Sequence, residues 1–240
     1  MSSLASELGR YTATEMIDVR KEYQQLVARR RACRACAGLE NPAVVAGGAF
    51  DHQEIGPWSA WQGRLDAQVM VVGQDYSDVA YFERRSGVED SSNPTNLNLV
   101  ALFASIGIVI CAPGTRQGRG EVFFTNAILC LKRGGMQSKV RPEWFVECGK
   151  RFLRAQIELI RPKVVVGLGE RAHNAVRSAF GLPPEPIRRA VTSPGDRLPT
   201  GAFAIGVYHC GARVVNIARN LELQRTDWQR VAAVLRAPAV

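Results

Sequence analysis

Four short runs of apolar residues recur along the chain and have the character of buried parallel strands. Each is rich in Val, Ile or Phe. Most end near a glycine or a polar turn, as strands do when helices cover both faces of their sheet. The runs span residues 68–72, 122–129, 163–168 and 203–208.

Helical patterns precede and separate these runs. In residues 14–31, the side chains of Met16, Val19, Tyr23 and Leu26 fall at helical spacing. Further helices are expected at residues 96–106, 142–161, 170–180 and 221–235. Because strands and helices alternate, the pattern predicts an α/β fold. We expect three layers, α/β/α, around a central, mainly parallel, four-stranded sheet.

Two segments are rich in glycine, proline and charged residues and are expected to be loops, namely residues 112–120 and 188–201. The sequence contains no internal repeat and no stretch with the composition of a domain linker. Residues 1–240 are therefore expected to form a single domain.

The charge of the chain adds a hint about its partner. With 31 basic and 22 acidic residues, the formal net charge is +9. A basic excess suits a polyanion such as nucleic acid, although a basic protein without such a partner is the simpler alternative. The sequence has no apolar run of membrane-spanning length and no signal-like start. We therefore expect no membrane association and a cytoplasmic location.

The spacing of the cysteines points to a metal centre. Cys33 and Cys36 form a Cys-x2-Cys pair after the first predicted helix, Cys130 closes the second strand, and Cys148 lies in the next helix. Four thiolates that converge in this way hold either zinc or a [4Fe–4S] cluster, and spacing alone does not choose between them. Cys130 and Cys148 are also compatible with ordinary buried cysteines. Cys111 and Cys210 are additional thiols.

Three longer stretches carry a family resemblance. Residues 125–130 read Thr-Asn-Ala-Ile-Leu-Cys, residues 148–153 read Cys-Gly-Lys-Arg-Phe-Leu, and residues 160–169 contain Arg-Pro-Lys followed by an apolar strand and Leu-Gly. Their order and spacing resemble the iron–sulfur branch of the uracil-DNA glycosylase superfamily. The resemblance implies a [4Fe–4S] cluster on Cys33, Cys36, Cys130 and Cys148. Such a cluster would tie residues 1–40 to the core.

Two further motifs show where the chain departs from that branch. Residues 73–78, Gly-Gln-Asp-Tyr-Ser-Asp, are more similar to the Gly-Gln-Asp motif of the classical uracil-DNA glycosylases than to the Gly-Glu form of the iron–sulfur branch. Residues 208–211, Tyr-His-Cys-Gly, stand where the superfamily has His-Pro-Ser. The histidine is kept, whereas Cys210 and Gly211 replace the other two residues.

The resemblance assigns roles to three residues at the ends of predicted strands, where open α/β sheets bind ligands. Asp75 is expected to orient a water and to stabilise positive charge on the sugar. His209 is expected to hydrogen-bond the departing base, and Asn126 to recognise uracil through its paired donor and acceptor. Turn capping by Asp75 or Asn126, and a structural role for His209, are the alternatives.

The remaining candidate contacts follow from the same motifs. Gly73, Gln74 and Tyr76 are expected to contact the base, and Arg213 to contact DNA. Asp78 is a second candidate carboxylate. Classical family members stack an aromatic ring on the base. Residues 93–96, near the place where that ring is expected, read Asn-Pro-Thr-Asn and contain no aromatic residue. Tyr81 and Phe82 are the candidates to replace it.

These observations together predict a monofunctional DNA glycosylase that flips uracil out of DNA and hydrolyses its N-glycosidic bond, leaving an abasic site. The protein is expected to act as a monomer on uracil-containing DNA. Two other functions stay open because of the altered motifs. One is a glycosylase for another deaminated base, hypoxanthine or xanthine. The other is a non-catalytic iron–sulfur module that binds lesions.

Overall fold

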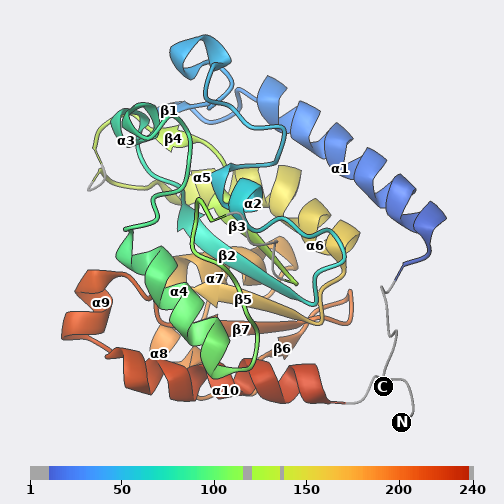
Figure 1. Cartoon of the computed structure of the whole chain (residues 1–240), viewed down its shortest axis with the longest axis vertical. Helices are drawn as coiled ribbons and strands as arrows, with labels where there is room; N and C mark the ends of the chain where they lie inside the picture. Colours follow the sequence, from blue (N-terminus) through green and yellow to red (C-terminus); the bar gives the residue numbers. More distant parts are fainter. Residues whose placement is uncertain (1–10, 116–120, 136–137, 238–240) are drawn as a thin grey trace.

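A central sheet organises the protein (Figure 1), whose computed structural model describes residues 11–115, 121–135 and 138–237. The strand order is β3-β2-β5-β7-β6. The first four strands pair in parallel, and β6 pairs antiparallel with β7. The strands are β2 (Val69–Asp75), β3 (Val122–Ile128), β5 (Val164–Leu168), β6 (Asp196–Arg197) and β7 (Phe203–Val207). The four predicted parallel strands are confirmed.

The fifth strand was not predicted. Residues 188–201 were expected to form a loop, but they include most of helix α8 (Ile187–Ala190) and all of β6. A strand of two residues is too short to show a periodic pattern, which explains the error. Gly195, just before β6, has a φ of 91° that favours glycine, so the turn into this strand has a local cause. Of the other predicted loop, residues 116–120 lie outside the described residues.

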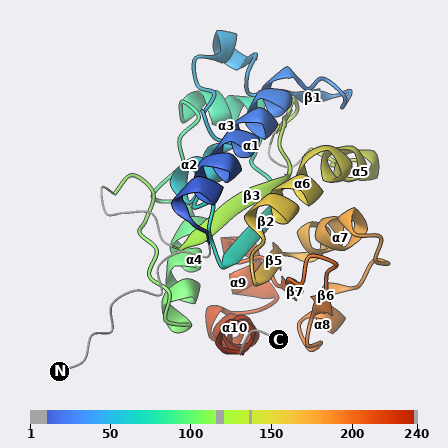
Figure 2. The same cartoon turned by 90° about the vertical axis from the view of Figure 1, so that its right-hand side faces the viewer.

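Helices cover both faces of the sheet (Figure 2). Side chains that alternate along the strands point to opposite faces, so each face has its own apolar core. Met70 and Val72 of β2 contact the first core, whereas Val69 and Val71 contact the second. The first core includes residues of α1 (Ala13–Ala32), α6 (Arg154–Ile160) and α7 (Glu170–Ala179). The second includes residues of α2 (Pro57–Trp61), α4 (Pro94–Ser105) and α10 (Leu221–Arg236).

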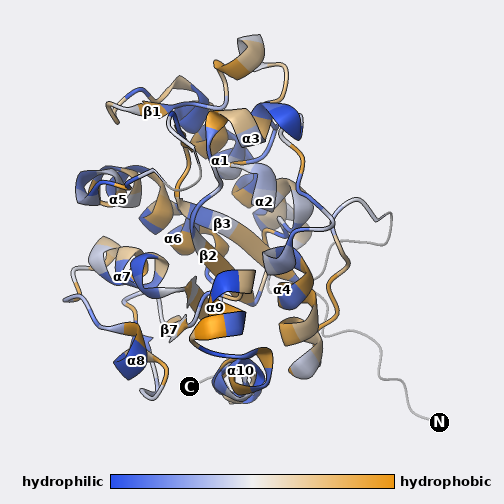
Figure 3. Cartoon of the chain, turned by 90° about the vertical axis from the view of Figure 1, so that its left-hand side faces the viewer, coloured by the Kyte–Doolittle hydropathy of each residue, from blue (hydrophilic) through white to orange (hydrophobic). Residues whose placement is uncertain are grey.

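This arrangement confirms the predicted three-layer α/β/α architecture. In Figure 3 the strands at the centre carry mostly hydrophobic colours, and the surrounding helices carry both hydrophilic and hydrophobic colours. Within the described part of the chain, no helix combines the length and the apolar character that crossing a bilayer requires.

The N-terminal helix α1 shows how local sequence sets an element. It begins at a capping box in which the Thr12 hydroxyl accepts from the Glu15 amide and the Glu15 carboxylate accepts from Thr12. One side buries Tyr23, Leu26 and Val27 against the first core. The helix ends at Ala32, so that Cys33 is the first residue beyond it.

The helix predicted between Pro142 and Pro162 is interrupted. It consists of α5 (Pro142–Cys148), a π-helical segment at Gly149–Leu153, and α6. A π-helical turn is rare, and such turns gather at functional sites. Here the turn directly follows Cys148.

Smaller elements complete the fold at the carboxyl end of β2 and β3. Strand β1 (Leu39–Glu40) pairs antiparallel with β4 (Leu131–Lys132), and helix α3 (Val79–Arg84) follows β2. A short 3-10 segment spans Val45–Gly48. Helix α9 (Ala212–Ile217) follows β7 and precedes α10.

Candidate functional site

A cavity of about 560 Å³ opens at the carboxyl ends of the parallel strands. We call it the strand-end cavity. Asp75 is the last residue of β2, Asn126 lies in β3, and His209 follows β7. All three line the cavity, as do the predicted contact residues Gly73, Gln74 and Tyr76. The structure therefore brings together Asp75 and His209, which are 134 positions apart in the sequence.

The carboxylate of Asp75 is held from two directions. The Lys132 ammonium lies 3.2 Å from Oδ1, and both side chains of this ion pair are 6% exposed. The Gln74 side-chain amide donates to Oδ2. The Gln74 carbonyl in turn accepts from the Arg171 guanidinium at 3.2 Å. Because each carboxylate oxygen has its own partner, the orientation of Asp75 is set before any substrate enters.

The imidazole of His209 is neutral and has a defined tautomer. Burial lowers its pKa, and the nearby Asp75 carboxylate only partly opposes that effect. The Gly211 backbone N–H donates to Nδ1 at 2.9 Å. An Nδ1 that accepts carries no proton, so the proton of the neutral ring is on Nε2. His209 is thus a hydrogen-bond donor through Nε2–H.

The Cys-Gly pair after His209 has a steric explanation. A Cβ at Gly211 would lie 2.8 Å from Cε1 and 2.9 Å from Nδ1 of His209. Only glycine brings its N–H close enough to bond Nδ1 without displacing the ring. The glycine in place of the serine of the His-Pro-Ser pattern therefore leaves room for the imidazole in this orientation.

Gly73 has a similar role next to Asn126. The two residues are paired in register between β2 and β3. A Cβ at Gly73 would lie 2.7 Å from the Asn126 side-chain nitrogen and 2.8 Å from the Trp58 ring. Glycine therefore lets both side chains approach this strand. Asn126 is 5% exposed.

Aromatic side chains form another part of the wall. Tyr76, Tyr81 and Trp58 line the cavity. The Tyr76 hydroxyl donates to the Val88 carbonyl at 3.2 Å, and its ring meets Tyr81 edge-on. Of the two rings considered for base stacking, Tyr81 lies at the cavity. Phe82 is fully buried in a separate apolar cluster and is not among the lining residues.

The second candidate carboxylate, Asp78, has a structural role. Its Oδ1 accepts from the Tyr81 amide at 2.9 Å, so Asp78 caps the N-terminus of α3. It is not among the residues that line the strand-end cavity. Arg213 is likewise not among the lining residues, and it is exposed on α9.

Sequence reasoning missed several residues of this cavity. Lys132 follows the second predicted strand, residues 122–129. A lysine shortly after a buried strand was the sequence feature that could have identified it. Glu89 and Asn96 also line the wall, where the Asn96 amide donates to Glu89 Oε2 at 2.7 Å. Neither they nor Trp58 belong to a recognisable motif, so their position depends on the tertiary fold.

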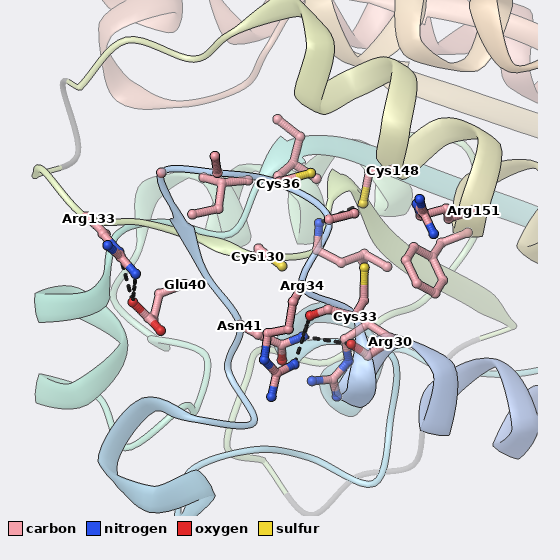
Figure 4. A pocket seen from close by; sticks show the side chains of 17 residues that line it. Arg30, Cys33, Arg34, Cys36, Glu40, Asn41, Cys130, Arg133, Cys148 and Arg151 are labelled. Atoms are coloured by element: carbon pink, nitrogen blue, oxygen red, sulfur yellow. Dashed lines mark hydrogen bonds and ion pairs between the residues drawn. The ribbon is translucent and has the colours of Figure 1, made fainter.

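A second cavity gathers the four predicted metal ligands. It has a volume of about 390 Å³, and its lining includes Cys33, Cys36, Cys130 and Cys148 (Figure 4). We call it the cysteine cavity. Cys33 caps the end of α1, Cys148 ends α5, and Cys130 lies in the turn between β3 and β4. All six cysteines of the chain are free thiols.

Hydrogen bonds hold the Cys-x2-Cys segment against the core. The Asn41 side chain donates to the carbonyls of Arg30 and Cys33 at 2.7 and 2.9 Å. The Trp144 indole donates to the Ala37 carbonyl at 3.1 Å. The backbone on both sides of Cys36 is therefore fixed to α1 and α5.

The thiols of this cavity are poorly suited to carry charge alone. Burial, and to a smaller extent the neighbouring Cys33 and Cys36, raise the pKa of Cys130 to about 12. The pKa of Cys148 and that of Cys36 are raised by the same two causes. Thiolates so close together are stable only when a cation binds them, so this donor set fits a metal or an iron–sulfur group.

Comparison with known proteins adds independent information. Residues 60–232 match the family model described as the uracil DNA glycosylase superfamily. Over 136 residues, the chain is 30% identical to a type-5 uracil-DNA glycosylase of Pyrobaculum aerophilum. That match covers 52% of this chain and 57% of the relative's length. The matched residues include Asp75 of β2, Asn126 of β3 and His209.

Proposed function

The chain belongs to the uracil DNA glycosylase superfamily, and we propose that it is a DNA glycosylase that releases uracil and leaves an abasic site. The observation that carries this proposal is the convergence of Asp75, Asn126 and His209 on the strand-end cavity. A glycosylase must hold a flipped base and stabilise opposite charges on sugar and base, and this cavity offers groups for each task.

On the sugar side, Asp75 would act as an oriented carboxylate. Cleavage of the N-glycosidic bond builds positive charge on the sugar, which a nearby carboxylate stabilises. The free face of the same group would orient the attacking water. The ion pair with Lys132 and the bond from Gln74 keep the carboxylate in one orientation, so little reorganisation is needed during the reaction.

On the base side, His209 and Asn126 would act together. Uracil departs with negative charge on its oxygens, and the Nε2–H of neutral His209 is a donor for such an oxygen. The Asn126 amide can donate to O4 and accept from N3–H. Cytosine presents the reverse pattern, which would leave buried polar groups unpaired and is therefore excluded.

The cysteine cavity would hold a [4Fe–4S] cluster on Cys33, Cys36, Cys130 and Cys148. The all-cysteine donor set fits a cluster, and the resemblance of the flanking motifs to the iron–sulfur branch favours it over zinc. When bound, the cluster would cross-link the end of α1 to β3 and α5, a structural contribution. Iron and acid-labile sulfide content of the purified protein, with its visible absorption, tests this assignment.

Uracil release from a uracil-containing oligonucleotide tests the function. We expect Asp75→Asn and His209→Ala to lower the single-turnover rate by roughly a hundredfold or more, because each removes a group aimed at developing charge. Asp78→Asn is the matched control, since asparagine also caps helices and Asp78 does not line the cavity. Rates of both variants within a few-fold of the parent would remove Asp75 and His209 from the mechanism.

A panel of oligonucleotides, each with one lesion, tests the choice of base. Uracil is expected to be released fastest. Preferential release of hypoxanthine or xanthine would show that the pocket is built for a deaminated purine. Lesion binding without release of any base would indicate a non-catalytic module.

A further inference from the structure

One wall of the strand-end cavity contains a carboxyl group that the proposed mechanism does not use. Glu89 lies in the segment between α3 and α4 and is 6% exposed. It shares the cavity lining with Asp75, Asn126 and His209. The cavity thus contains two buried carboxyl groups in different surroundings.

The two carboxyl groups differ in their partners. Asp75 has an ammonium at 3.2 Å. Glu89 takes part in none of the ion pairs found among the described residues, because the nearby Arg85 binds Asp90 at 2.9 Å. Its Oε2 accepts from the Asn96 amide at 2.7 Å.

The other oxygen of Glu89 has no such partner. Oε1 is buried and forms no hydrogen bond in the described structure. The Trp58 side chain approaches the carboxyl closely enough to lower its pKa slightly, but it does not reach hydrogen-bond geometry with Oε1. A buried polar atom without a partner is costly. Because Glu89 lines the cavity, a bound ligand would supply the partner once the carboxyl group turns Oε1 toward it.

The charge on the departing base decides which form of Glu89 is compatible with the reaction. An ionised Glu89 beside a base that leaves as an anion would raise the barrier by repulsion. A protonated carboxyl would lower it, because its O–H donates to an oxygen that gains negative charge. Each uracil carbonyl has two lone pairs, so a base already bound by Asn126 and His209 can accept a further bond.

We propose that Glu89 is a further catalytic residue that acts as a neutral acid, with its Oε1–H donating a hydrogen bond to a carbonyl oxygen of the flipped base. No proton leaves Glu89 in this step: the glycosidic electron pair moves onto the base, and the hydrogen bond to the base oxygen strengthens. The inference rests on the proposed glycosylase function. It gives the two carboxyl groups opposite tasks, with Asp75 at the sugar and Glu89 at the base.

The electrostatic surroundings of Glu89 favour the neutral form. Burial raises its pKa to about 7, and the adjacent Asp90 carboxylate raises it as well. The Asn96 amide, the Arg85 guanidinium and Trp58 lower it by less. The hydroxyls of Tyr76 and Tyr81, which also face this carboxyl, are neutral because burial raises their pKa.

The rate of uracil release as a function of pH tests the inference. Under single-turnover conditions with excess protein, the rate of the parent should fall about tenfold per pH unit above the Glu89 pKa. Glu89→Gln keeps a donor and an acceptor but cannot ionise. Because its amide is a donor at every pH, its rate should not show this alkaline decline. Glu89→Met removes the donor and should lower the rate by roughly a hundredfold at about pH 6.

Several outcomes would overturn the inference. If the rate of Glu89→Gln declines with rising pH as that of the parent does, the decline belongs to the ionisation of another group. A Glu89→Met rate equal to that of the parent would show that the carboxyl is not used. If Glu89→Met fails to fold by circular dichroism, the comparison of the parent with Glu89→Gln still decides. Absence of base release from the parent would contradict the proposed function and this inference together. Base release whose pH profile is the same in the parent and in Glu89→Gln would contradict the inference alone.

Discussion

The two cavities of this protein differ in how their polar groups are satisfied. In the strand-end cavity, Asp75 is bound by Lys132 and Gln74, and His209 accepts from Gly211. In the cysteine cavity, among the described residues, the hydrogen bond to a predicted ligand sulfur runs from the Leu129 amide to Cys148 at 3.4 Å. The thiols otherwise raise one another's pKa.

This difference teaches how each site is assembled. The strand-end cavity lies at the ends of parallel strands, so the pairing register that builds the sheet also positions its side chains. The cysteine cavity joins the end of α1, the turn after β3 and the end of α5, which the sheet does not align. We expect folding alone to complete the first cavity and a bound group to be needed to complete the second.

Removal of a cysteine ligand should therefore have the largest effect. We expect Cys148→Ala to lower iron content sharply and to reduce the free energy of unfolding by several kilocalories per mole, because binding of a structural metal group is coupled to folding. Iron analysis and thermal unfolding measure both. Cys111→Ser is the matched control, since Cys111 does not line the cavity. Equal iron content in both variants would contradict the ligand assignment.

Breaking the Asp75–Lys132 ion pair tests whether the strand-end cavity is held by interactions within the protein, without a bound group. Lys132→Met leaves a buried carboxylate without its cation, which should cost about 3 to 5 kcal/mol of unfolding free energy. Urea denaturation measures this value, and iron content should stay near that of the parent.

A double variant sharpens that test. Asp75→Asn combined with Lys132→Met removes the uncompensated charge, so much of the lost stability should return. Additive losses in the double variant would mean that the two side chains are not energetically coupled. The ion pair would then be a weak determinant of the orientation of Asp75.

The buried Glu89 makes the strand-end cavity sensitive to pH in a predictable direction. Its pKa is raised from 4.5 to about 7 in the folded protein. The folded state therefore holds this proton more tightly than the unfolded state. The stabilisation is complete below about pH 4.5 and is lost as the pH rises through about 7, a change on the order of 3 kcal/mol.

Glu89→Gln should remove this dependence. We expect the stability of the variant, relative to the parent, to increase between about pH 5 and about pH 8 when measured by urea unfolding. The exposed Glu83→Gln on α3 is the control and should show no such trend. Parallel curves for the parent and Glu89→Gln would indicate that Glu89 ionises normally, independently of any activity assay.

The contrast between the cavities also marks how far the sequence alone could lead. The four parallel strands were predictable because each buried run is rich in Val, Ile or Phe, and Asp75 and His209 were predictable because they follow such runs. The Cys-x2-Cys pair was likewise recognisable. Strand β6 was missed because two residues show no period. Lys132 and Glu89 were missed because their burial arises only when distant segments pack together.

Arg213 should have the smallest effect, because it lies outside both cavities and is exposed on α9. Arg213→Ala should weaken DNA binding slightly and reduce the slope of log affinity against log salt by about 1, since one phosphate contact is lost. The stability and the single-turnover rate at saturating protein should not change. Arg20→Ala on α1, which lies on the other side of the molecule in Figure 1, is the control. Equal salt slopes for the two variants would exclude Arg213 from the DNA interface and leave the basic residues nearer the strand-end cavity, Arg171 first among them, to contact the phosphates.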